Sequence, residues 1–251
     1  MTKKVNKQTT HFGFEKVVKS EKAKKVESVF SSVSKKYDLM NDLMSFGMHR
    51  MWKRYLLLMS KVTKGHKVLD IAGGTGDISY LLSNRVGKNG KVILCDINRD
   101  MLHAGRLRFI DKGMINNIEY VQADAENLPF KENSFDAVTM GFGLRNVTDK
   151  KKCLDSIYKV LKPGGRLLIL EFSTPDKWLE PAYGKYLFKF IPWLGEIVTQ
   201  DRPSYQYLSE SILVHPDQEE VKQIMSDASF EHCDYFNLNA GIVAIHSGYK
   251  I

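Results

Sequence analysis

The sequence predicts an α/β domain in which a mostly parallel sheet carries helices on both faces. Between residues 67 and 172, short apolar segments alternate with amphipathic segments, and strands that are apolar along their whole length are typical of parallel sheets covered on both sides. A glycine-rich loop directly follows the first of these segments, where open α/β sheets bind their ligands. With 251 residues, 43% of them apolar, the chain is long enough for one domain of this class.

Five predicted strands form the parallel part of the sheet. They are KVLDIA (67–72), KVILCDI (91–97), IEYVQA (118–123), FDAVTMGF (135–142) and RLLILEF (166–172). Most of them are separated by predicted helices, which cover about 76–86, 98–112 and 149–161. The sequence LKPGG (161–165) is expected to end the last of these helices, because glycine commonly follows a helix C-terminus.

The segments on either side of this unit follow other patterns. Residues 20–60 are predicted to be helical, because apolar residues recur there every three or four positions. Residues 173–214 carry four prolines and the aromatic sequence YLFKFIPWLGEIV (186–198). A helix is predicted over 215–230, and two strands joined near Asn239–Gly241 are expected to add an antiparallel pair to the sheet.

Positive charge is concentrated near the N-terminus. Residues 1–36 contain ten lysines and three glutamates, a balance of +7 within a net charge of +8 for the chain. Such a segment could face anionic lipid or nucleic acid. A solvent-exposed lysine-rich surface is an equal alternative.

The predicted compartment follows from apolar segments and cysteines. The first residues contain no apolar signal region, and no apolar segment reaches the ~18–20 residues of a membrane-spanning helix. Cys95, Cys153 and Cys233 lie far apart without a CxxC motif, so we expect reduced thiols and no zinc site. We therefore expect a cytoplasmic protein, at most peripheral to the inner face of the cell membrane.

The glycine loop VLDIAGGTGD (68–77) is expected to bind a nucleotide-like ligand. Gly74 and Gly76 fit a GxGxxG pattern, but Ser79 stands at its third position, and the chain has no GxxxxGK[ST] sequence. The loop by itself does not distinguish among nucleotide ligands.

Three carboxylates narrow the choice of ligand. Asp70, Asp96 and Asp124 lie at or just after the ends of the first three strands, and Asp96 stands where an acid hydrogen-bonds ribose hydroxyls. Together they would repel a pyrophosphate and attract a cationic nucleoside, and S-adenosylmethionine fits this description. Each acid taken singly could instead be an ordinary cap or loop residue.

Several motifs taken together resemble the class I S-adenosylmethionine-dependent methyltransferases, and more closely the ubiquinone/menaquinone biosynthesis C-methyltransferase family. The motifs of the wider class are LDIAGGTGD (69–77), CDIN (95–98) with Met101, QADAENLPF (122–130), FDAVTMGFGLRNV (135–147) and LKPGGRLLILEFS (161–173). The closer resemblance also rests on THFGF (10–14), YDLMNDLMSFGMHRMWKR (37–54), SYQYLSESI (204–212) and HPDQ (215–218). The resemblance runs from about residue 9 to the C-terminus.

The resemblance implies a Rossmann-like methyltransferase fold of seven strands and a division of the chain into two parts. Residues 1–60 would form a basic N-terminal segment and helical lid. Residues 61–251 would form the methyltransferase domain, with an insertion at about 173–214. Within that insertion, segment 186–198 would dock on a membrane or fold inward as a lid over the substrate ring.

The resemblance also implies the reaction and its ligands. The methyl donor would be S-adenosylmethionine, with no metal, and the substrate would be 2-polyprenyl-6-methoxy-1,4-benzoquinol, demethylmenaquinol or both, methylated at a ring carbon. Donor contacts are expected from Asp70, Gly73, Gly74, Thr75, Gly76, Asp96, Asp124, Ala125 and Gly141. At Gly141 the sequence departs from relatives that often carry serine. A homodimer, association with other quinone-biosynthesis enzymes and peripheral membrane contact are left open.

Arg145 and Asn146 are the predicted catalytic residues. A guanidinium could stabilise a developing phenolate, and an asparagine could orient it or a bridging water. The alternative is that Arg145 makes a structural ion pair and Asn146 caps a turn. Weaker candidates, whose segments could fold over the substrate, are His11, Tyr37, Asp38 and His49.

The sequence is also compatible with other functions. A methyltransferase for another small molecule or for RNA, and a non-catalytic assembly factor, would share the loop. The chain has no Pro-Pro for a [DNS]PP[YF] motif and no Pro-Cys or Thr-Cys, so we expect no nucleic-acid substrate.

Overall fold

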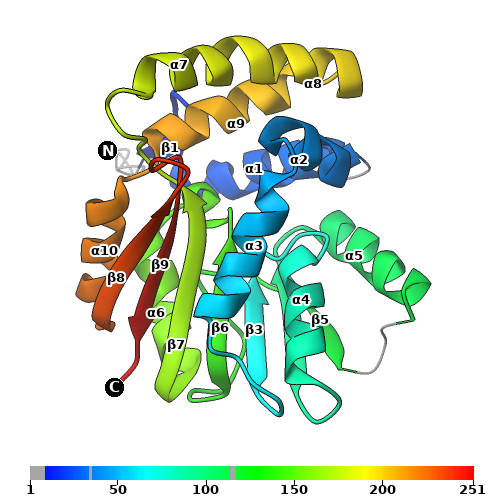
Figure 1. Cartoon of the computed structure of the whole chain (residues 1–251), viewed down its shortest axis with the longest axis vertical. Coiled ribbons are helices and arrows are strands. Elements are labelled where there is room, and N and C mark those ends of the chain that lie inside the picture. Colours follow the sequence, from blue (N-terminus) through cyan, green and yellow to red (C-terminus); the bar gives the residue numbers. More distant parts are fainter. Residues whose placement is uncertain (1–8, 34–35, 114–116) are drawn as a thin grey trace, which may run out of the picture.

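The computed structural model describes residues 9–33, 36–113 and 117–251, and its central feature is a seven-stranded sheet (Figure 1). The strands are β3 (Lys67–Ile71), β4 (Lys91–Asp96), β5 (Ile118–Gln122), β6 (Phe135–Gly141), β7 (Leu161–Phe172), β8 (Glu231–Leu238) and β9 (Val243–Tyr249). Their order is β5-β4-β3-β6-β7-β9-β8. The first five are parallel, and β9 is antiparallel to both of its neighbours.

Helices cover both faces of this sheet. The helices on one face are α3 (Met48–Met59), α4 (Asp77–Val86) and α5 (Arg99–Asp111), and those on the other are α6 (Lys150–Val160) and α10 (Gln218–Asp227). Successive residues of a strand point to opposite faces, so Val68 packs on the α3–α5 side and Leu69 on the α6–α10 side. The predicted α/β class with a mostly parallel sheet and an antiparallel C-terminal pair is confirmed.

A cap of helices lies over the carboxyl ends of the parallel strands (Figure 1). Its elements are β1 (Thr9–Phe12), β2 (Glu15–Val18), α1 (Lys19–Val33), α2 (Tyr37–Ser45), α7 (Glu180–Lys185), the π-helical segment η3 (Tyr186–Phe190), α8 (Ile191–Thr199) and α9 (Arg202–Val214). A third apolar core joins the N-terminal part of this cap to the part from the insertion, and it includes Val33, Met40, Leu187, Ile191 and Ile212.

The segment Glu180–Thr199 is one helix interrupted by a wide turn. The N–H of Ile191 donates to the carbonyl of Tyr186, an i→i+5 bond of the π type. Pro192 follows at once, and because it has no N–H it cannot make the ordinary helical bond to the preceding turn. Three of the four prolines of the insertion, Pro181, Pro192 and Pro203, therefore lie in the first turns of helices, whereas Pro175 precedes them in an irregular segment.

Three features differ from the sequence-based expectation. Residues 20–60 form three helices, and one break lies at Phe46–Gly47, where both residues have positive φ. The LKPGG sequence does follow the end of α6 at Val160, but strand β7 already begins at Leu161 and has an irregularity before Arg166. The β1–β2 hairpin was not anticipated. Among the described residues, none of the helices combines the length and apolarity needed to cross a bilayer.

An ion-pair network holds α3 against α4 and α5. Lys53 Nζ lies 2.6 Å from one oxygen of Asp77, and Arg108 Nη1 lies 2.6 Å from the other. Burial by itself raises the pKa of Asp77, but the charges of Lys53 and Arg108 outweigh it and hold that pKa far below its ordinary value. Asp77 is also the first residue of α4, where a negative charge is favourable to the helix dipole.

We expect the Lys53→Met variant to be less stable than the wild type by about 3 kcal/mol at pH 7, because a partly buried carboxylate loses one of its two cations. A carboxylate with a lowered pKa contributes stability above its unfolded pKa of about 3.9, and that contribution is lost as the pH falls. Urea unfolding between pH 7 and pH 3 measures both effects. The variant should lose less stability on acidification than the wild type, and parallel pH curves for the two proteins would contradict this account.

Candidate functional site

A cavity of about 590 Å³ opens at the carboxyl edge of the sheet, beside the glycine loop. Its walls come from the loop after β3, the ends of β4 and β6, the segment after β5 and one side of α1. Gly74, Asp96, Asp124, Ala125 and Gly141 all line it. The structure thus brings together five of the nine residues that the sequence analysis assigned to donor binding.

The glycine loop is shaped by contacts that leave no room for side chains. Gly74 has φ +57°, and Gly76, the N-cap of α4, has φ +86°. A Cβ on Gly73 would lie 2.2 Å from Leu94 Cδ1, and one on Gly76 would lie 2.5 Å from the ring of Phe109. Gly73 and Gly76 therefore hold the turn in shape while Gly74 presents its backbone to the cavity.

Asp96 joins the loop to the end of β4. One of its oxygens accepts from the N–H of Gly74 at 2.8 Å, and the other accepts from the N–H of Asn98 at 2.9 Å. Burial raises the pKa of Asp96, while these backbone N–H groups act in the opposite direction. A carboxylate oxygen has two acceptor sites, so Asp96 can hold the loop and still accept hydrogen bonds from a ligand.

Asp70 and Thr75 do not line this cavity. Asp70 is fully buried and accepts from the hydroxyls of Ser79 and Thr139, each at 2.7 Å, so it ties β3 to β6 and α4. Burial raises the pKa of Asp70 to about 6. The hydroxyl of Thr75 donates to Asp38 Oδ1 at 2.9 Å, a contact that fastens α2 to the glycine loop.

We call this 590 Å³ cavity the donor cavity. Helix α1 closes it from the side opposite the loop. Ala23, Val26, Glu27 and Phe30 line it, as do Asn98 and Met101 from the start of α5. The helical spacing in residues 20–60 indicated that α1 has an apolar face but not what that face covers. Tertiary contacts of α1 with α5 and α9 place these residues at the cavity.

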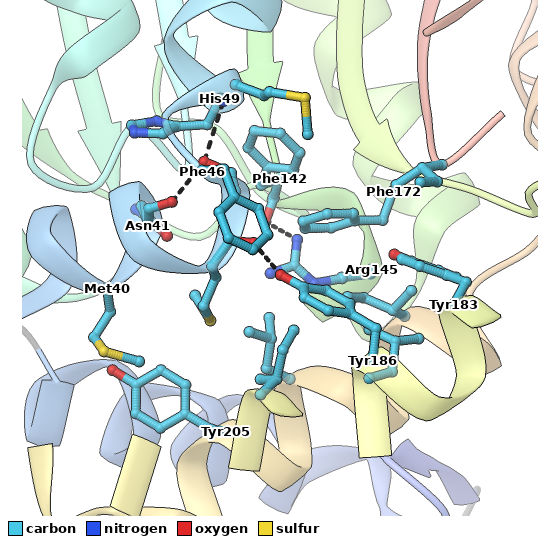
Figure 2. A pocket seen from close by; sticks show the side chains of 18 of the residues that line it. Met40, Asn41, Phe46, His49, Phe142, Arg145, Phe172, Tyr183, Tyr186 and Tyr205 are labelled. Carbon is cyan, nitrogen blue, oxygen red and sulfur yellow. Dashed lines mark hydrogen bonds between the residues drawn. The ribbon is translucent and has the colours of Figure 1, made fainter. Parts of the chain in front are cut away.

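A second cavity, of about 360 Å³, lies under the cap and is lined mainly by apolar side chains (Figure 2). Its wall comes from α1, α2, α3, α7, η3, α8 and α9. Phe30 and Phe142 line both this apolar cavity and the donor cavity. The two spaces therefore meet at these two rings, beside the end of β6.

Arg145 and Asn146 face different cavities. Arg145 lines the apolar cavity and Asn146 the donor cavity. The Arg145 guanidinium is 2.7 Å from Glu171 Oε1. It also donates to the carbonyl of Phe142, as Figure 2 shows. Both charged side chains are almost completely buried, and within the described part of the chain Arg145 Nε has no hydrogen-bond partner. The ion pair that the sequence left as an alternative is present, and it stands in the wall of a cavity.

Asn146 is held by a tyrosine from the cap. Its Oδ1 accepts from the hydroxyl of Tyr207 at 2.9 Å. Tyr207 in turn stacks on Phe12 of the N-terminal hairpin, with ring centroids 4.1 Å apart. The orientation of the Asn146 amide therefore depends on both parts of the cap, the N-terminal hairpin and the helix α9 of the insertion.

The weaker candidates are spread over several places. His49 lines the apolar cavity, and its Nε2 is 2.8 Å from Asp42 Oδ1. Burial lowers the pKa of His49. Asp38 binds Thr75 and Arg108, His11 is an exposed residue of β1, and the side chain of Tyr37 lies outside the described part of the structure.

The sheet order, the glycine loop and the acid at the end of β4 define the class I methyltransferase fold. Among solved structures, an Aquifex aeolicus SAM-dependent methyltransferase has a TM-score of 0.63 at 18% identity, and the match covers 85% of this chain and 98% of that one. A Haemonchus contortus phosphoethanolamine N-methyltransferase in complex with S-adenosyl-L-methionine has a TM-score of 0.58 at 17% identity, with 79% and 52% covered. At these identities the likeness concerns the fold alone.

Sequence comparison identifies the family. Residues 16–250 match the model of the ubiE/COQ5 methyltransferase family, and the chain belongs to this family. It is 57% identical over 246 residues to a ubiquinone/menaquinone biosynthesis C-methyltransferase UbiE of Klebsiella pneumoniae, with 98% of each chain covered. It is equally identical over 245 residues to the Legionella pneumophila protein of the same name, with 97% and 98% covered.

The side chain of Ile78 fills the space beside Gly141 in the wall of the donor cavity. A Cβ on Gly141 would lie 2.3 Å from Ile78 Cδ1. We expect Gly141→Ala to destabilise the protein by about 1 kcal/mol, because the Ile78 side chain must move to a poorer position. Ile78→Val removes the clashing methyl group and should cancel most of that cost in the double variant. Urea unfolding of the two single variants and the double variant checks the coupling, and strictly additive effects would refute it.

Proposed function

We propose that this protein transfers the methyl group of S-adenosylmethionine to a ring carbon of a polyprenyl quinol. The substrate would be 2-polyprenyl-6-methoxy-1,4-benzoquinol, demethylmenaquinol or both, as the names of the relatives suggest. The observation that carries the proposal is the pair of cavities meeting at Phe30 and Phe142. One carries the carboxylates Asp96 and Asp124 and lies at the glycine loop, whereas the other is lined mainly by apolar side chains and suits an isoprenoid chain.

The donor cavity fits a cationic nucleoside better than a phosphate ester. Asp96 would bind the ribose hydroxyls, and the Asp124–Ala125 segment would lie along the base, with Gly141 beside the methyl-transfer position. Lys19 and Lys152 also line the cavity, but they are paired with Asp149 and Glu126. When bound, S-adenosylmethionine supplies an electrophilic methyl group on a sulfonium ion.

The apolar cavity has walls suited to a flexible chain. Met40, Met44 and Met48 line it together with aromatic side chains, and methionine adapts to irregular apolar shapes. With the quinol ring near Phe142, the isoprenoid chain would extend between α2 and the helix Glu180–Thr199.

The reaction needs positioning and charge stabilisation more than a covalent nucleophile. Loss of the phenolic proton makes the ring carbon electron-rich, that carbon takes the methyl group, and loss of its own proton restores the aromatic ring. Arg145 would stabilise the phenolate that develops. Glu171 holds the guanidinium in the cavity wall, and Asn146 would orient the ring oxygen or a bridging water from the donor side.

Incubation of the purified protein with labelled S-adenosylmethionine and a short-chain demethylated quinol, kept reduced, tests the proposal. We expect label on a ring carbon of the quinol, identified by mass spectrometry. Separate reactions with the benzoquinol and the naphthoquinol show whether the protein methylates the substrate of one quinone pathway or of both. Label in added RNA or in soluble metabolites, with none in either quinol, would overturn the assignment.

The Asp96→Ala variant should bind S-adenosylmethionine more weakly by about 1–3 kcal/mol, because a charged hydrogen-bond partner is lost. Isothermal titration calorimetry measures the affinity. Asp96→Asn keeps one acceptor for the N–H of Gly74 and serves as the matched control, so it should lose less. Unchanged affinity in a folded Asp96→Ala protein would remove this residue from the donor site.

The Arg145→Gln variant should have kcat reduced about 10²–10³-fold with the donor Kd nearly unchanged, as expected for a group that stabilises charge in the transition state. Because Arg145→Gln leaves Glu171 buried without its partner, the double variant with Glu171→Gln serves as the stability control. Full turnover in the double variant would show that the pair is structural.

A separate variant tests how Asn146 is held. Tyr207→Phe keeps the ring stacking on Phe12 and removes only the hydroxyl that binds Asn146, so it shows whether turnover depends on the orientation of the Asn146 amide.

A further inference from the structure

Exposed apolar side chains gather where α2 meets α8. They are Leu39, Leu43 and Phe46 of α2 and its C-cap, and Trp193 and Ile197 of α8, and they are 38–73% exposed. The two helices are in contact, and the ring of Phe190 bridges Phe46 and Trp193 at centroid distances of 6.3 and 5.9 Å. We call these five residues the α2–α8 patch. A contiguous exposed apolar surface of this kind marks an interaction site.

The apolar cavity reaches the protein surface at Phe46, a member of the patch. Phe46 is 73% exposed and at the same time lines that cavity (Figure 2). On the other side of the opening, Tyr186 and Ile191 line the cavity from the helix that carries Trp193. An apolar surface is therefore continuous from the outside of the cap into the cavity.

The charges around the patch favour an anionic partner. Every acidic side chain of α2 and α8 already has a cationic partner: Asp38 with Arg108, Asp42 with Arg50, and Glu196 with Arg202. In the described part of the chain, Lys185 and Lys189 are exposed and have no carboxylate partner.

These two lysines continue the stripe of the patch. Lys185, Lys189, Trp193 and Ile197 recur every four residues, and all four are exposed. An exposed face that combines lysines with tryptophan and aliphatic side chains is typical of helices that lie in a lipid interface.

We propose that the α2–α8 patch docks on the surface of an anionic phospholipid bilayer, with the opening at Phe46 facing the lipid. The contact is interfacial, with apolar side chains in the acyl boundary and lysines at the head groups. A second copy of the chain or another protein on this surface would cover the opening. If the proposed function holds, the isoprenoid chain enters the cavity directly from the bilayer without crossing water.

Flotation with vesicles of phosphatidylglycerol and phosphatidylethanolamine tests the docking without any enzyme assay. The Trp193→Ser/Ile197→Ser variant should partition about 10-fold or more weakly than the wild type, because two apolar side chains no longer leave water. Leu107→Ser/Ile110→Ser on α5 is the matched control, since these side chains are half exposed and lie outside the patch. It should bind as the wild type does.

The dependence of binding on lipid charge and salt tests the two lysines separately. Lys185→Gln/Lys189→Gln should weaken binding to the anionic vesicles several-fold at low salt and leave binding to neutral vesicles unchanged. Equal binding of the wild type and Trp193→Ser/Ile197→Ser, or no vesicle binding by the wild type, overturns the proposal. A dimer in sedimentation velocity that the same variant dissociates would also overturn it, in favour of a second copy.

A kinetic comparison separates this inference from the proposed function. Trp193→Ser/Ile197→Ser should keep wild-type turnover of a water-soluble short-chain quinol and lose most of its turnover of a long-chain quinol embedded in vesicles. Equal loss on both quinols would contradict delivery from the bilayer. Absence of turnover in the wild type on both would refute the proposed function, while the flotation result would still decide the docking.

Discussion

Apolar packing between two segments far apart in the sequence creates the candidate site. Val33 and Met40 from the N-terminal part meet Tyr183, Leu187 and Ile212 of the insertion in one core. This core holds α1 over the donor loop and α2 over the insertion helices, so both cavities depend on it. Neither segment is part of the seven-stranded sheet, yet together they convert its open carboxyl edge into enclosed space.

Two ion pairs in the molecule differ in how deeply they are buried and in how fully their charges are paired. Lys53–Asp77 joins three helices and has a second cation in Arg108. Arg145–Glu171 is more deeply buried and leaves Arg145 Nε without a partner among the described residues. A buried pair contributes little net stability compared with apolar residues of the same size. Its position in the wall of the apolar cavity is where the proposed charge stabilisation would require it.

The sheet and the donor loop were predictable because they depend on local patterns. Apolar runs bounded by polar residues predicted the parallel strands, and all five ended within one residue of the observed positions, although β7 starts five residues earlier than predicted. The glycine loop and Asp96 follow from the same logic, since they occupy strand ends. Gly74 and Asp96 are directly hydrogen-bonded in the structure.

The parts of the fold and the site that the sequence did not predict depend on tertiary contacts that no single segment reveals. Asp70 stands one residue before the end of β3, so its side chain points between sheet and helix and binds Ser79 and Thr139. The β1–β2 hairpin turns at Gly13, whose Cβ position is occupied by Glu210 of α9. The division of the chain at residue 60, and the roles of the site residues, stay predictions.

The wide turn at Tyr186–Phe190 has a consequence for the orientation of the whole cap helix. The buried residues Tyr183, Leu187, Ile191 and Gly195 recur every four positions, as do the exposed ones between them. In a regular α-helix, four residues rotate about 40° beyond a full turn, so such stripes would wind around the axis. The i→i+5 turn rotates less per residue and takes up part of this drift. Deleting one residue there would restore α-helical bonding but rotate Trp193 and Ile197 by about 100° relative to the preceding turn.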